Sequence, residues 1–131
     1  MRLLLDTHIW LWSLLDPTRL GKKIRRTLED PDTELWLSPI STWEFAMLVE
    51  YGRIEINTEI EEWVADAMTL APLNEAPLTH EIAIRSRSVQ LPHKDPADRF
   101  IAATALVLDL TLVTADARLL AAKTLPTMAN R

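Results

Sequence analysis

The chain has 131 residues, of which 48% are hydrophobic and 25% charged, so we expect a single globular domain over residues 1–131. No apolar run approaches the ~20 residues of a membrane-spanning helix, and Asp6 interrupts the apolar start too early for a signal peptide. We therefore expect a cytoplasmic protein with no membrane contact. The lack of cysteine excludes disulfides and thiolate metal sites.

The first half of the chain alternates short apolar strands with helices. Proline and glycine mark the boundaries, because the residue before Pro17 resists helical geometry and Gly52 can end a helix. The predicted elements, in order, are a strand at Leu3–Asp6, helices at His8–Leu15 and Leu20–Glu29, a strand at Glu34–Ser38 and a helix at Pro39–Tyr51.

The second half continues the pattern with four more helices. Thr79 is a plausible helix cap, and Pro96 suits the first position of a helix. The predicted elements are helices from Thr58 or Glu59 to about Leu70, at Thr79–Val89, Pro96–Leu108 and Asp116–Ala122, and strands at Leu70–Leu73, Leu110–Thr114 and, at one edge, Thr124–Thr127. Apolar strands that alternate with helices indicate an α/β fold whose parallel sheet is covered on both faces.

Four acidic residues lie at positions expected near the carboxyl ends of the parallel strands. Asp6 and Asp116 follow strands, and Glu44 and Asp98 lie near the starts of helices. Ligands of open parallel sheets bind beyond the carboxyl ends of the strands, so we expect the four carboxylates to converge there. Setting these four aside leaves 15 of the 19 acidic residues against 14 basic ones, so much of the net charge of −5 belongs to the site.

Helix capping is the alternative explanation for each acid, since Asp and Glu are favoured at helix starts in any protein. Position along the helix separates the two explanations in part. If Ser38 caps its helix, Glu44 lies more than a turn inside it. If Asp95 caps the helix at Pro96–Leu108, the side chain of Asp98 is free to bind a ligand. For Asp6 and Asp116 both roles stay open.

Oxygen ligands of this kind suit a hard cation, Mg²⁺ or Mn²⁺. Such an ion typically serves phosphate chemistry, in which it activates water and stabilises charge on the phosphate. The hydroxyls of Thr7, Ser41 and Thr114 stand beside the acids and could orient them, or could make only local turn bonds.

Several segments, taken together in their order and spacing, resemble PIN-domain ribonucleases, in particular VapC-like toxins of type II toxin–antitoxin modules. They run nearly the length of the chain: Leu4–His8, Ser38–Glu44, His93–Ala105 and Leu112–Asp116. The resemblance implies a three-layer α/β/α sandwich around a small parallel sheet of four or five strands. It also implies Mg²⁺- or Mn²⁺-dependent cleavage of RNA, a homodimer and an inhibitory antitoxin partner.

The resemblance further implies roles for individual residues. Asp6, Glu44, Asp98 and Asp116 become the catalytic, metal-binding quartet, and Asp95 also fits the pattern although a capping role competes. Thr7, Ser41 and Thr114 match positions that support the acids. Lys94 and Arg99 are the basic residues expected to contact RNA, and Trp10, Trp12, Trp43 and Trp63 could supply an apolar surface for the antitoxin.

Two other functions remain open from the sequence. A metal-dependent phosphatase on a similar sheet would want a second aspartate two residues after Asp6, where this chain has His8. A non-catalytic RNA-binding module would use the acids as helix caps alone.

Overall fold

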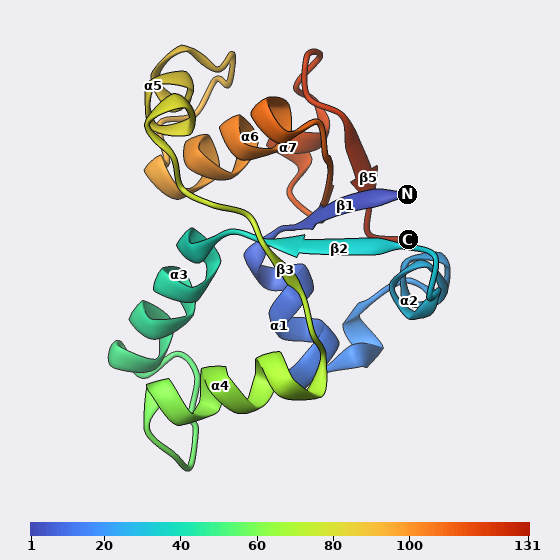
Figure 1. Ribbon diagram of the computed structural model, residues 1–131, viewed down its shortest axis with the longest axis vertical. Coiled ribbons are helices and arrows are strands. Elements are labelled where there is room, and N and C mark those ends of the chain that lie inside the picture. Colours follow the sequence, from blue (N-terminus) through green and yellow to red (C-terminus); the bar gives the residue numbers. More distant parts are fainter.

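The computed structural model describes residues 1–131 as seven α-helices around a five-stranded sheet (Figure 1). All strand pairs are parallel, and the strand order is β3-β2-β1-β4-β5. The strands are β1 (Arg2–Leu5), β2 (Glu34–Leu37), β3 (Asn74–Glu75), β4 (Thr111–Thr114) and β5 (Thr127–Ala129). The helices are α1 (Thr7–Leu15), α2 (Lys22–Glu29), α3 (Pro39–Glu50), α4 (Ile60–Leu70), α5 (His80–Ser88), α6 (Pro96–Leu108) and α7 (Ala117–Leu120), with a short 3₁₀ helix, η1, at Pro17–Arg19.

The sheet is buried on both faces, as its unbroken apolar strands predict. Successive side chains of a strand point to opposite faces, so Leu3 and Leu5 belong to one core while Leu4 belongs to the other. Helices α5, α6 and α7 lie together on one side of the sheet, and α1 and α4 lie on the other (Figure 1). This arrangement confirms the predicted α/β/α sandwich.

Helix boundaries follow the predicted caps closely. The Ser38 hydroxyl accepts from the N–H of Ile40 at the start of α3, and Thr79 caps α5 in the same way. Gly52 has a φ of 71°, in the left-handed region that glycine tolerates best, just after α3 ends. None of the helices is long and apolar enough to span a membrane.

Two predicted strands are wrong in position. Leu70 is the last residue of α4, and the strand begins only at Asn74, where it pairs with Trp36 of β2. The other edge strand, expected at Thr124–Thr127, runs instead over Thr127–Ala129, because its pairing with β4 starts at Thr127. Both are short edge strands, whose few ladder contacts leave little periodicity in the sequence.

The strand order places a topological switch at the centre of the sheet. From β1 the chain builds outward through β2 and β3 on one side, and through β4 and β5 on the other. A crevice is expected beyond the carboxyl ends of strands where the order reverses. Asp6 lies directly after β1, and its N–H continues the ladder by donating to the carbonyl of Val113 at 3.0 Å.

Candidate active site

An acidic cavity of about 480 Å³ opens at this switch point. It brings together all four predicted carboxylates and Asp95, which come from segments far apart in the sequence. The charged and ring-bearing side chains of its lining are Asp6, Glu44, Asp95, Asp98, Asp116, Arg19, Arg118, His8 and Trp12.

Both oxygens of the Asp6 carboxylate are held by hydrogen bonds. Its Oδ1 accepts from the N–H of Thr7 at 2.9 Å, and its Oδ2 accepts from the Thr114 hydroxyl at 2.6 Å. Asp6 is therefore both the cap of α1 and a member of the cavity. Burial raises the pKa of this carboxyl, against the effect of its hydrogen bonds.

A chain of hydroxyls orients Glu44. The Thr7 hydroxyl donates to Glu44 Oε1 at 2.5 Å and lies 2.9 Å from the hydroxyl of Ser41. Since a hydroxyl has one proton to donate, Ser41 is the donor to Thr7. Burial raises the pKa of Glu44, and the charges of Asp6 and Asp98 raise it further. Thr7 and Thr114 therefore each contact an acid directly, and Ser41 contacts Glu44 only through Thr7.

Asp98 is held by His93, a residue that the sequence did not single out. His93 Nε2 lies 3.0 Å from Asp98 Oδ2, while its Nδ1 is buried without a hydrogen-bond partner. A carboxylate only accepts, so the Nε2–H of His93 is the donor to Asp98. Burial, followed by the charges of Asp95 and Asp6, raises the pKa of Asp98 to about 6.

Asp116 is more exposed than Asp98, and its pKa is lowered where that of Asp98 is raised. Arg118 Nη2 lies 3.1 Å from Asp116 Oδ2 and 3.8 Å from Asp98 Oδ2, so one guanidinium bridges two carboxylates of the cavity. Its hydrogen bond to Asp116 lowers the pKa of that carboxyl. The sequence signal was present, because Arg118 is two residues from Asp116, but an exposed arginine at a helix start is common.

Arg118 contacts Asp98 and Asp116, two carboxylates proposed to hold a cation, so the guanidinium and the ion should compete for them. Replacing Arg118 by glutamine should tighten Mn²⁺ binding by about two- to fivefold, the range of an exposed ion pair. Titration calorimetry would measure the change. Arg53→Gln, an exposed arginine with no side-chain hydrogen bond, is the matched control. Equal affinities in the two variants would rule out competition between the guanidinium and the ion.

The structure corrects the expected role of Arg99. Its guanidinium does not line the cavity but donates to five backbone carbonyls, those of Ser86, Arg87, Val89, Leu91 and His93, at 2.9 to 3.4 Å. With its donors engaged inside the chain, Arg99 fixes the segment that carries His93. Lys94 is exposed in the same segment, and its contact with RNA stays a prediction.

The donor chemistry of the cavity fits a hard divalent cation, because every acidic ligand offers oxygen only. Asp6, Glu44 and Asp98, with Asp95 beside them, could hold such an ion. In this structure, however, no three acidic or imidazole side chains form a group arranged to hold a metal as they stand. The carboxylates instead repel one another, which is the second cause of the raised pKa of Asp98.

A second prediction concerns pH. The pKa of Asp98 rises from its ordinary 3.8 to about 6, so the folded protein binds this proton more tightly than the unfolded chain. The stability that Asp98 contributes is therefore fully present below pH 3.8 and is lost as the pH rises through about 6. Thermal melts should show that Mn²⁺ raises the melting temperature clearly at pH 7.5 and much less at pH 5, where protons compete for the carboxylates. An equal shift at both pH values would contradict this.

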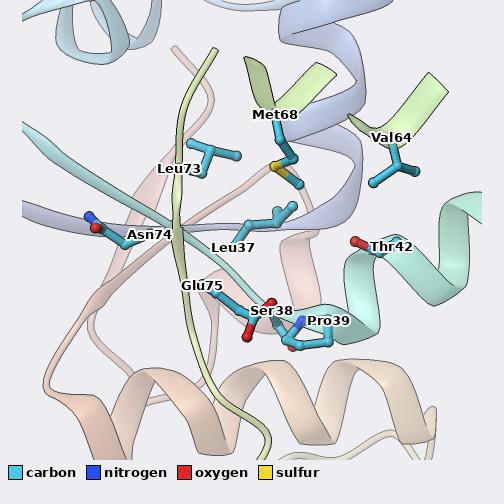
Figure 2. Close-up of a pocket in the computed structure, with 9 residues that line it drawn as sticks. All are labelled: Leu37, Ser38, Pro39, Thr42, Val64, Met68, Leu73, Asn74 and Glu75. Carbon is cyan, nitrogen blue, oxygen red and sulfur yellow. The ribbon is translucent and has the colours of Figure 1, made fainter. Parts of the chain in front are cut away.

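A separate hollow of about 400 Å³ lies between the β2–β3 edge and helices α3 and α4 (Figure 2). Leu37, Val64, Met68 and Leu73 point into it, and Glu75 is its one charged residue. The hollow shares no residue with the acidic cavity. It holds a single carboxylate, whereas the acidic cavity gathers five, so the acidic cavity is the candidate active site.

Comparison with known proteins identifies the family to which the chain is related. The family model for the PIN domain matches residues 3–125. Ribonuclease VapC22 of Mycobacterium tuberculosis (strain ATCC 25618 / H37Rv) is 36% identical over 121 residues, which cover 88% of each chain.

Solved structures repeat the fold at low identity. VapBC2 from Rickettsia felis, bound to a DNA fragment from its promoter, superposes with a TM-score of 0.73 at 14% identity, over 98% of both chains. A toxin–antitoxin complex from Klebsiella pneumoniae gives 0.65 at 23% identity, over 98% of this chain and 97% of that one.

Proposed function

We propose that this chain, which belongs to the PIN-domain family, is a metal-dependent endoribonuclease that acts as the toxin of a toxin–antitoxin pair. The family membership confirms the resemblance seen in the sequence, and the chain is a homologue of a ribonuclease VapC. One observation carries the chemical part of the proposal. Asp6, Glu44, Asp98 and Asp116 meet in one cavity at the switch point of the sheet.

The side chains of the cavity would have different roles in hydrolysis. A bound Mg²⁺ or Mn²⁺ ion would activate water and stabilise charge on the phosphate. Thr114 and the N–H of Thr7 fix both oxygens of Asp6, so this ligand needs little reorganisation. Thr7 fixes Glu44, and His93 fixes Asp98. Arg118 can leave Asp98 and turn to the phosphate, for which a guanidinium is well shaped.

Cleavage of total RNA in the presence of Mg²⁺ or Mn²⁺ tests the proposal directly. We expect discrete fragments, loss of cleavage with EDTA, and recovery when Mn²⁺ is added in excess. Mapping the fragment ends would also identify the RNA. Cleavage that persists in EDTA would refute metal dependence, and its absence under all conditions would refute the nuclease assignment.

We propose an antitoxin and a second copy of this chain as protein partners. The fold occurs in a toxin–antitoxin complex, and the surface carries exposed apolar side chains such as Leu70, which is 81% exposed. Two of the four tryptophans pack against the core. Trp10 is buried against Phe45, and the partly buried Trp63 stacks on the same ring. Size-exclusion chromatography with light scattering would show a dimer, and a monomer at all concentrations would exclude it.

A further inference from the structure

One wall of the acidic cavity has no carboxylate. It is formed by His8 and Trp12 of α1 and by Arg19 at the end of η1. We call these three side chains the stacking wall. The His8 and Trp12 rings lie 5.8 Å apart, and the Arg19 guanidinium lies over the Trp12 ring at 4.5 Å from its centre.

Helix geometry sets the wall beside the catalytic carboxylates. His8 and Trp12 are four residues apart, so they occupy the same face of α1, one turn above the other. The helix begins directly after Asp6, and His8, Trp12 and Arg19 line the same cavity as that carboxylate. The wall therefore continues from the acidic floor of the cavity without a break.

The side chains of the wall are open to solvent. His8 and Arg19 are exposed and Trp12 is half-buried, whereas Trp10, two residues away on the other side of α1, is fully buried in the core. No side-chain acceptor other than the Trp12 ring engages the Arg19 guanidinium. Its backbone carbonyl is anchored by Asn130 at 2.9 Å, which holds η1 in place while the side chain remains available.

A polynucleotide that reaches five carboxylates needs a favourable surface next to them. Aromatic rings and guanidinium planes provide it, because unpaired bases stack on both and the cation also attracts the phosphate backbone. The same rings could also contact a protein partner. Their position inside the cavity, next to the proposed catalytic carboxylates, favours RNA as the molecule that they bind.

We propose that His8, Trp12 and Arg19 form a stacking site for one unpaired base of the RNA, adjacent to the phosphodiester that is cleaved. The site would select single-stranded or looped RNA, and it rests on the proposed nuclease function. Base stacking tolerates any sequence, so the expected selectivity is for an unpaired base and not for a particular one.

A coupling experiment tests the stacking site. A single-stranded RNA that the protein binds is compared with a set in which each of its bases is removed in turn, beginning beside the cleavage site where one has been mapped. For the wild-type protein, one abasic position should weaken binding about tenfold or more. In Trp12→Leu, removal of that same base should cost almost nothing further, because the interaction is already lost.

Binding is measured by fluorescence anisotropy on Asp98→Asn protein, which we expect not to cleave. A failure of the nuclease assignment would therefore show in the cleavage assay and not in this one. His8→Ala and Arg19→Gln, both at exposed positions, repeat the test if Trp12→Leu does not fold. Trp43→Ala, at a tryptophan outside the cavity that is 52% exposed, is the control. Independent effects of Trp12 and of every abasic position would overturn the proposal, as would unchanged RNA affinity with loss of a protein partner.

Discussion

Replacing Asp98 by asparagine should abolish RNA cleavage and, without added metal, raise the melting temperature at pH 7.5. Activity should fall more than about a hundredfold. Removing a residue that only orients a metal ligand typically costs about ten- to a hundredfold, and this change removes the proposed ligand itself. The amide keeps an oxygen that can accept from His93, so the local structure should survive.

The gain in stability follows from the raised pKa. A pKa of about 6 means that the surroundings of Asp98 disfavour its charge despite the contact with His93. A neutral amide removes that cost at pH 7.5, whereas at pH 5 the wild-type carboxyl is largely protonated already. The difference in melting temperature between variant and wild type should therefore shrink as the pH is lowered. Sites that bind ligands commonly trade stability for function in this way.

Asp32→Asn, in an exposed turn, is the matched control and should change neither property. Asp98→Asn protein that retains cleavage would remove Asp98 from the site. A variant that is inactive but less stable than wild type at pH 7.5 would show that Asp98 serves the fold and not the cation.

Arg99→Lys should destabilise the protein by about 3 kcal/mol and lower its activity as well. The guanidinium donates to five carbonyls in a fixed fork, and a lysine ammonium has three donors at one point. Several carbonyls would be left without a partner, and the segment that carries His93 would loosen. Urea denaturation measures the free energy of unfolding.

The control for Arg99 is Arg87→Lys on the neighbouring helix α5, where the side chain is exposed and makes no hydrogen bond. If Arg99 instead contacted RNA, as its sequence context suggested, the lysine variant would unfold at the same urea concentration as wild type and would lose only RNA affinity.

Local chemistry made the acidic site predictable. Ser38 and Pro39 fix the start of α3, so the depth of Glu44 follows by counting, and Asp95 does cap α6 as expected. Apolar strands that alternate with helices then bring those helix starts to one sheet edge. Both roles were left open for Asp6, and the two are compatible, because this residue caps α1 and also lines the cavity.

The rest depended on tertiary geometry that no local pattern encodes. His93 reaches Asp98 because the segment after α5 folds back over α6, and Arg99 holds it there. Arg19 comes to the cavity only because η1 returns toward α1. The sequence does not show whether an arginine donates to backbone carbonyls, as Arg99 does, or is exposed to a ligand. The burial of the side chain in the folded protein distinguishes the two roles.

Asp6 and Asp116 both cap a helix and line the cavity, and this combination has an evolutionary consequence. Asp6 and Asp116 each accept from the backbone at the start of a helix, so their loss is expected to weaken the fold as well as the proposed cleavage. Glu44 and Asp98 have no such duty, and at Asp98 loss of the charge is expected to stabilise the resting protein. We therefore expect descendants freed from selection for cleavage to lose Glu44 or Asp98 first, and to keep Asp6 and Asp116 as remnants of a vanished activity.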